Sequence, residues 1–238
     1  MDATSSEPAL PLVWTVLGIA GGLIFYGRFY VQWIASERKK KSVMPIAFWY
    51  MSCAGVLLLF PYAVRTRSPI GALGLCFNLI VYARNLVHIW RKKQPLPAAL
   101  VGGLHVLLAS VTLVALGLVV FTWRAEYEVT RQATTAQAAD TWFWLGVGLT
   151  GQVLFALRFL VQWIVTERKK MSVVPTAFWY LSAVAASLQL GCFAQRQEWV
   201  FAAGMAATIF IYVRNLWFIY RKQDAACVPG DPSERQTS

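Results

Sequence analysis

The stretch RFYVQWIASERKKKSVMPIAFWYMS, residues 28–52, occurs a second time 130 positions later as RFLVQWIVTERKKMSVVPTAFWYLS, residues 158–182. Eighteen of the 25 aligned positions are identical, whereas the segments that follow, 53–71 and 183–201, share one leucine among 19 positions. The later segments stay largely apolar, which is all that a span through lipid requires. The closer match of the first stretch therefore indicates a constraint other than hydrophobicity.

The composition around this repeat is that of a membrane protein. Of the 238 residues, 58% are hydrophobic and 14% are charged, and the mean hydropathy is +0.51. These values exclude an ordinary soluble globule. Long unbroken apolar runs also lack the alternation of a β-barrel, so the sequence predicts an all-α integral membrane protein with seven transmembrane helices. The predicted spans are 12–35, 43–64, 69–90, 97–123, 141–165, 173–194 and 198–220.

The repeat predicts the domain organisation. Residues 14–92 align with 144–222 without a gap, so each unit holds three helices and one further span joins the units. A single extra crossing gives both units the same direction in the membrane, which predicts a 3+1+3 parallel repeat of triple-helix bundles. The predicted parts are a first three-helix repeat at 12–92, a linker transmembrane helix at 97–123, an external loop at 124–140, a second three-helix repeat at 141–222 and a cytoplasmic tail at 223–238.

Lysine and arginine residues gather at one set of loops, which predicts the orientation. The side richer in them faces the cytoplasm, so the N-terminus lies outside and the C-terminus inside. The same basic rim is suited to anionic lipid head groups. The richer side holds Arg38, Lys39, Lys40, Lys41, Arg91, Lys92, Lys93, Arg168, Lys169, Lys170, Arg221, Lys222 and Arg235, and the poorer side holds Arg65, Arg67, Arg124, Arg131 and Arg196.

The remaining arginines lie inside predicted spans, and they are Arg28, Arg84, Arg158 and Arg214. Arg28 precedes Arg38 by ten residues, which places it roughly 15 Å inside the membrane at about 1.5 Å per residue. Gln32 follows one turn later on the same face, and Arg158 with Gln162 repeats this polar line. A charge at mid-membrane costs on the order of 2.5–3.5 kcal/mol, so these arginines need a cavity or partners.

Acids near these helices are too few to pair with every arginine. Glu37 and Glu167, at the cytoplasmic mouth, are the nearby carboxylates, so two positive charges stay unmatched. Guanidinium groups bind phosphate or carboxylate in a bidentate manner, and we therefore expect a central polar cavity for an anion. The predicted ligand-binding residues are Arg28, Gln32, Tyr82, Arg84, Asn85, Arg158, Gln162, Tyr212, Arg214 and Asn215, with Glu37, Lys39, Lys40, Glu167, Lys169 and Lys170 at the cytoplasmic mouth.

Other kinds of site find no support in the sequence. Its four cysteines and two histidines lack metal-ligand spacing, and no nucleotide-binding or hydrolase motif is present. We therefore expect no metal, no cofactor, no catalytic residue and no nucleic-acid partner. Two simpler explanations of the repeated blocks stay open: the blocks can hold insertion signals and packing contacts alone, and the arginines can bond to helix-end carbonyls and water.

The blocks VQWIASERKKKSVMPIAFWYMS and YARNLVHIW, with their copies, resemble the lipid A biosynthesis N-terminal membrane domain. This three-helix module occurs alone, duplicated, or ahead of the catalytic domains of lipid-A-disaccharide synthase. It is similar in turn to the three-helix units of PQ-loop and SWEET-type sugar transporters. Gln32 and Gln162 stand where the glutamine of the Pro-Gln pair would, and Val31 and Val161 replace its proline. The resemblance implies work on lipid A or a related glycolipid in a bacterial inner membrane, with a periplasmic N-terminus and 124–140 as a periplasmic loop.

Two functions follow from the resemblance and the arginines together. The first is a carrier or flippase-like protein, which binds an anionic lipid-linked sugar or lipid phosphate between the bundles and rocks them for alternating access. The alternative is a non-transporting scaffold, which recruits a lipid-A-disaccharide-synthase-like glycosyltransferase through the basic rim. A membrane enzyme is a third hypothesis with only Glu37 and Glu167 as candidate acids. Synthase activity is not expected, because a nucleotide-sugar glycosyltransferase needs soluble α/β domains.

Overall fold

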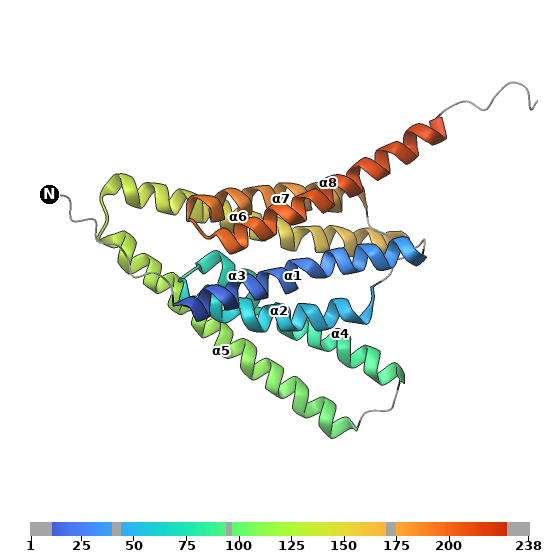
Figure 1. Ribbon diagram of the computed structural model, residues 1–238, viewed down its shortest axis with the longest axis horizontal. Helices are drawn as coiled ribbons and strands as arrows, with labels where there is room; N and C mark the ends of the chain where they lie inside the picture. The colour runs from blue at the N-terminus through green and yellow to red at the C-terminus, as the bar shows by residue number, and fades with distance from the viewer. Residues whose placement is uncertain (1–10, 40–43, 94–96, 170–174, 228–238) are drawn as a thin grey trace, which may run out of the picture.

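A computed structural model of the chain describes residues 11–39, 44–93, 97–169 and 175–227. Within these ranges every regular element is an α-helix (Figure 1). Since α3 and α4 share one span, seven helical spans in the described ranges are long and apolar enough to cross a membrane, which confirms the predicted class. The helices are α1 (Leu12–Lys39), α2 (Ile46–Arg65), α3 (Pro69–Cys76), α4 (Asn78–Lys93), α5 (Ala98–Arg131), α6 (Thr135–Lys169), α7 (Thr176–Gln195) and α8 (Trp199–Cys227).

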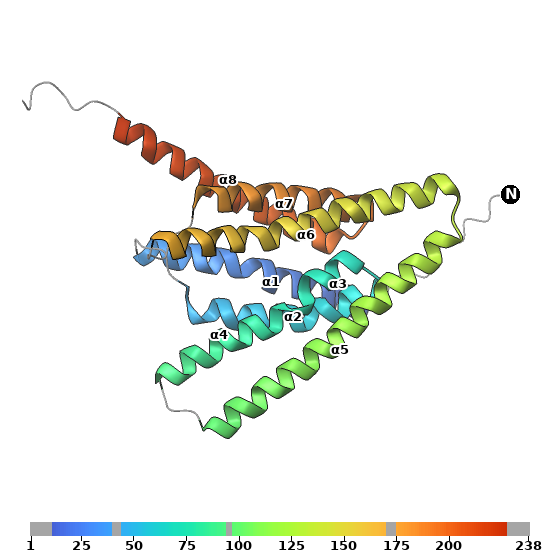
Figure 2. The same cartoon turned by 180° about the vertical axis from the view of Figure 1, so that it is seen from behind.

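Helices α1, α2, α6 and α7 lie alongside one another, and α4 and α5 are both inclined to them (Figures 1 and 2). Helices α1 and α6, which begin the two repeats, run in the same direction, and α2 and α7 run back. Helix α1 packs against α2 and α8, while α6 packs against α7 and α3. Each repeat therefore touches the other through its first helix. Helix α5 packs mainly against α3 and α4 of the first repeat.

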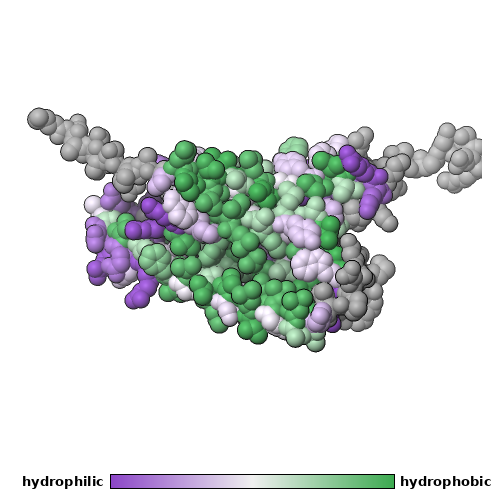
Figure 3. All heavy atoms as spheres, turned by 60° about the horizontal axis from the view of Figure 1, so that its bottom comes forward, coloured by the Kyte–Doolittle hydropathy of each residue, from purple (hydrophilic) through white to green (hydrophobic). Residues whose placement is uncertain are grey.

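The surface has the pattern of a membrane protein. A broad apolar belt covers the middle of the visible face, with hydrophilic side chains gathered toward its two ends (Figure 3). The C-terminal ends of α1, α4 and α6, which lead into the predicted cytoplasmic loops, lie together at one end of the molecule (Figure 1). We call this the basic end. That this end faces the cytoplasm remains a prediction from the distribution of lysine and arginine.

The interval 124–140, expected as a loop, is mostly helical. Helix α5 continues to Arg131 and α6 begins at Thr135, so the break is confined to 132–134. A capping box starts α6: the Gln137 N–H donates to Thr134 Oγ1 at 3.4 Å, and Gln137 Oε1 accepts from the Thr134 N–H at 3.2 Å. Both helices extend beyond their apolar runs, which is why hydropathy alone placed the boundaries too far apart.

The third span of the first repeat is divided into α3 and α4 at Phe77, although the sequence predicted one helix over 69–90. Just after the break, the Asn78 side chain donates to the Gly74 carbonyl at 2.9 Å. Thr208 makes the same bond to Gly204 at 2.7 Å in α8, at the position equivalent to Asn78. Such bonds to the carbonyl four residues earlier bend helices, and here the larger asparagine accompanies a full break.

Glycines allow the two repeats to approach closely. A Cβ on Gly204 of α8 would overlap the ring of Tyr26 in α1, and a Cβ on Gly74 of α3 would overlap the amide of Gln152 in α6. Gly74 and Gly204 are equivalent positions of the repeat. Both contacts between the repeats therefore depend on the absence of a side chain at the same position.

A polar cluster, here called the clamp, joins both repeats and α5 at the end remote from the basic end. Arg196 donates to both carboxylate oxygens of Glu126 and to Glu198, each at 2.9 Å. Glu198 also accepts from Ser68, the N-cap residue of α3. Burial raises the pKa of the Glu198 carboxyl. Burial also lowers the pKa of Arg196, but the bonds of Arg196 to Glu126 and Glu198 outweigh this effect, so that its pKa is raised.

Replacing Gly204 with alanine is expected to destabilise the protein by about 1–3 kcal/mol, because the added methyl must displace the packed ring of Tyr26. Thermal unfolding of the purified protein in detergent measures the effect. Gly102→Ala in α5 is the matched control, since a Cβ there meets no atom within 4 Å, and it should leave the unfolding temperature unchanged or slightly higher. Equal unfolding temperatures for the two variants would contradict the proposed close contact.

Candidate functional site

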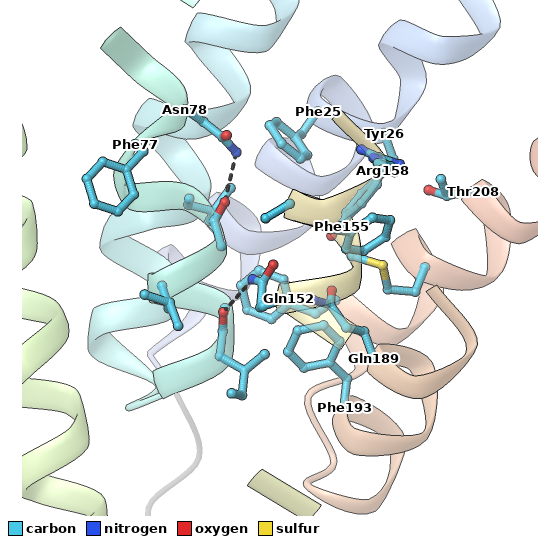
Figure 4. A pocket seen from close by; sticks show the side chains of 18 of the residues that line it. Phe25, Tyr26, Phe77, Asn78, Gln152, Phe155, Arg158, Gln189, Phe193 and Thr208 are labelled. Atoms are coloured by element: carbon cyan, nitrogen blue, oxygen red, sulfur yellow. Dashed lines mark hydrogen bonds between the residues drawn. The ribbon is translucent and has the colours of Figure 1, made fainter. Parts of the chain in front are cut away.

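A cavity of about 720 Å³ lies between the two repeats (Figure 4). Helices α1, α3 and α4 of the first repeat and α6, α7 and α8 of the second form its walls. The first helices share four equivalent lining positions, so the cavity is built largely around equivalent surfaces. These residues are Phe25, Tyr26, Arg28 and Phe29 in α1, and Phe155, Ala156, Arg158 and Phe159 in α6.

Arg28 is held by aromatic rings and a backbone carbonyl. Its side chain is 5% exposed, and the guanidinium carbon lies 3.5 Å from the ring centroid of Phe25 and 4.6 Å from that of Phe29. The guanidinium donates to the Phe25 carbonyl and, at 3.4 Å, to the Tyr82 hydroxyl. Stacking on aromatic faces stabilises a cation that has left water. The Nε of Arg28 is buried without a hydrogen-bond partner in the described part of the chain.

Arg158 occupies the same kind of cage in the second repeat. Its guanidinium carbon lies 4.4 Å from the ring centroid of Phe155 and 4.7 Å from that of Phe159. It donates to the hydroxyls of Ser182 and Tyr212, both at 3.0 Å. Its Nε is also buried and unpartnered among the described residues. Each repeat thus presents one aromatic-supported arginine, with donor capacity left over, to a shared cavity.

No acidic side chain is found among the described residues that line the cavity. Two guanidinium groups therefore face a mostly apolar space without a carboxylate to balance them. Removing a charge from water is costly unless a partner compensates. Arginine is weakly hydrated and presents several donors in one plane, so the arrangement is suited to an anion such as phosphate.

The other two intramembrane arginines lie outside the cavity lining. Arg214 of α8 donates to Glu37 of α1 at 2.7 Å, and its guanidinium carbon lies 4.5 Å from the ring centroid of Trp33. This pair joins the two repeats near the basic end. Arg84 is on the exposed side of α4.

The structure brings together four of the ten predicted ligand-binding residues at the cavity: Arg28, Tyr82, Arg158 and Tyr212. Gln32 and Gln162 are half-buried and do not line it, and Asn85 and Asn215 donate to carbonyls of their own helices at 2.8 and 2.9 Å. At the predicted cytoplasmic mouth, Glu37 and Lys39 are exposed. Lys40, Lys170 and the side chains of Glu167 and Lys169 lie outside the described residues.

Sequence reasoning missed several cavity residues. Gln152 and Gln189 line the cavity, but their equivalents in the first repeat are Gly22 and Leu59, so a comparison of the repeats passes over them. A polar residue within an apolar span was the available signal. The aromatic cage was also detectable, because phenylalanine recurs at three pairs of equivalent positions: Phe25 and Phe155, Phe29 and Phe159, and Phe48 and Phe178.

Comparison with known proteins gives a family match and a set of longer relatives. The model of the Lipid A Biosynthesis N-terminal domain matches twice, at residues 17–87 and 147–217. Lipid-A-disaccharide synthase of Chlamydia muridarum is 31% identical over 208 residues, 84% of this chain, and that of Chlamydia abortus is 28% identical over 214 residues, 87% of this chain. The matches cover 33% of those relatives, so the chain spans about one third of their length. No solved structure matches.

Arg28→Met is expected to keep the stability of the ligand-free protein within about 1 kcal/mol or to raise it, because it replaces an unbalanced buried charge with an apolar chain of similar length. Thermal unfolding in detergent without added lipid measures this. Arg196→Met is the comparison variant, since it leaves two clamp carboxylates unpaired and is expected to cost roughly 3 kcal/mol. A loss at Arg28 as large as that at Arg196 would show that Arg28 is structural.

Proposed function

The chain belongs to the Lipid A Biosynthesis N-terminal domain family, and from this premise we propose its function. We propose that this multi-pass membrane protein of lipid A or related envelope glycolipid biosynthesis binds an anionic lipid between its two repeats and moves it across the bacterial inner membrane. The lipid is a lipid-linked sugar or a lipid phosphate. The observation that carries the proposal is the pair of caged arginines, Arg28 and Arg158, in a cavity with no acid among its described lining residues.

The head group is the part of the ligand that the arginines recognise. Each arginine is already oriented by rings and hydroxyls, so little side-chain freedom is lost when an anion binds. A phosphate between Arg28 and Arg158 would accept from guanidinium N–H groups that the protein leaves unused. One anion would also balance charge contributed by both repeats. Equivalent positions in two repeats thereby serve a single ligand.

The apolar walls favour an amphiphilic ligand over a free phosphate. Rings of Phe25, Phe29, Phe155 and Phe159 surround the arginines. A small inorganic anion would leave much of the apolar wall uncovered, whereas the first part of a lipid chain would cover it. Cavities of about 300–1,000 Å³ are typical of ligand sites, and this cavity of about 720 Å³ holds more than a phosphate alone.

Polar contacts between the repeats at the two ends of the molecule support movement of the ligand. The Arg214–Glu37 pair joins α8 to α1 near the basic end, and the clamp joins Ser68 to Glu198 near the other. In alternating access, repeats rock about a site between them, and contacts at the two ends open in turn. We propose that these contacts close the two ends of the pathway.

A liposome assay tests transport directly. The double variant Arg28→Met/Arg158→Met should lower the rate at which a polyprenyl-phosphate sugar crosses the bilayer at least tenfold, because both head-group partners are lost. Arg131→Met is the matched control: Arg131 is exposed, pairs with Glu128 at 3.0 Å, and lies outside the cavity, so its rate should equal that of the wild type. Equal rates for the double variant and the wild type would exclude the proposed carrier.

A scaffold function is the second candidate, and the longer relatives favour it. The proteins named lipid-A-disaccharide synthase match this chain over only a third of their length, so in them the matched region adjoins further sequence. A separate glycosyltransferase that docks at the basic end would restore a comparable association in trans. Binding would then depend on basic loop residues and not on the cavity.

The scaffold is tested by changing Lys39, Lys40, Lys41, Lys169 and Lys170 to glutamine and measuring co-purification with lipid-A-disaccharide synthase of the same cell. Loss of charge should abolish recovery of the enzyme if the basic end recruits it, because rim charges steer association. The cavity variant Arg28→Met/Arg158→Met serves as the control and should retain the partner. Undiminished recovery after the lysine changes would rule out the scaffold.

A further inference from the structure

Gln189 of α7 is a buried polar side chain that faces the cavity without a partner. It is 1% exposed, it lines the cavity, and its Nε2 has no hydrogen-bond partner among the described residues (Figure 4). A buried amide donor left unsatisfied costs about 1–3 kcal/mol. The proposed anion site does not use this residue.

Gln152 of α6 is the second carboxamide at the same place. Figure 4 shows it next to Gln189, and the adjacent Gly151 packs against the Gln189 side chain, so that a Cβ on Gly151 would lie 2.7 Å from Gln189 Cγ. Gln152 donates from Nε2 to the Ile70 carbonyl at 3.3 Å, which links it to α3 across the repeat interface. Two amides, with both donor and acceptor atoms, therefore lie together on one wall.

The repeats differ at these two positions, so the pair is not needed to build a three-helix unit. Leu59 stands in the first repeat where Gln189 stands in the second, and it is fully buried in α2. Gly22 stands where Gln152 does. The first repeat thus forms the same three-helix unit with a leucine in place of one glutamine and a glycine in place of the other. Packing within a repeat therefore gives no reason for two glutamines.

The carboxamide pair lies at a defined distance from the arginines. Gln152 precedes Arg158 by six residues in α6, which is about 9 Å along the helix axis. Between the two lies the ring of Phe155, and Phe193 and Phe201 stack with ring centroids 5.1 Å apart on the glutamine side. The cavity therefore offers a cationic part, an aromatic wall and then a neutral hydrogen-bonding part.

We propose that the Gln152–Gln189 pair is a sugar subsite, and that the ligand is a lipid whose phosphate carries a hexose. This inference rests on the proposed function, since it places the phosphate at Arg28 and Arg158. A hexose has hydroxyl edges for the carboxamides and apolar C–H faces for the rings. A phosphate with one attached hexose spans the separation between the two parts. The sugar then lies on the second repeat, toward the clamp end.

The test compares two probes on the purified full-length chain in lipid nanodiscs: a polyprenyl phosphate, and the same lipid carrying one hexose on its phosphate. The variant Gln189→Leu introduces the residue that the first repeat has at the equivalent position, Leu59. It should weaken binding of the hexose lipid about tenfold, which corresponds to one or two lost hydrogen bonds, and leave the bare lipid phosphate within twofold. Gln195→Leu, outside the cavity on the same helix, is the matched control and should change neither affinity.

The outcomes separate the inference from the function on which it rests. Equal wild-type affinity for both probes, or an equal loss for both in Gln189→Leu, overturns the sugar subsite while lipid binding stands. Failure of Arg28→Met/Arg158→Met to weaken either probe overturns the anion site itself. Unfolding temperatures are measured in parallel, and Gln189→Met, which matches the volume of glutamine, takes the place of the leucine variant if that variant unfolds.

Discussion

A guanidinium group can lie within a membrane only where its charge is accommodated, and this constraint accounts for much of the arrangement between the repeats. Arg28 and Arg158 face a common cavity and not lipid, and there phenylalanine rings cover their guanidinium groups and tyrosine hydroxyls accept hydrogen bonds from them. Arg214 is accommodated by its ion pair with Glu37. The cavity and the contact between α1 and α8 thus both follow from the cost of a buried charge.

Small residues make this arrangement sterically possible. Gly204 leaves room for the ring of Tyr26, and the equivalent Gly74 leaves room for the side chain of Gln152. Helices of the two repeats therefore pack closely around the cavity. The clamp adds a polar contact at one end, where Arg196 holds carboxylates from α5 and from the second repeat. In this state of the protein, contacts of these two kinds hold the arginines in position. A site that is ordered in advance binds its ligand at a lower entropic cost.

The two repeats carry the same buried arginine but differ in their neutral polar residues. Each repeat supplies one caged arginine at the same position, whereas the second alone has glutamines at 152 and 189. Duplication explains the likeness, because both copies began with the same constraint. A ligand with an anionic centre and one polar extension has no twofold symmetry of its own. The difference between the repeats therefore matches the proposed lipid with its sugar on one side.

The sequence by itself determined the helical membrane class, the duplication and the presence of arginines that need compensation, since long apolar runs and the 130-residue offset are local properties of the chain. It also named Arg28, Arg158, Tyr82 and Tyr212. Only the tertiary structure decided which polar residues meet, because burial and pairing depend on how helices far apart in sequence are rotated against one another. Gln152 and Gln189, which come from different helices, therefore meet at the cavity, whereas Gln32 and Gln162, one helical turn beyond its arginines, do not line it. The SWEET-like plan and the orientation in the membrane remain predictions.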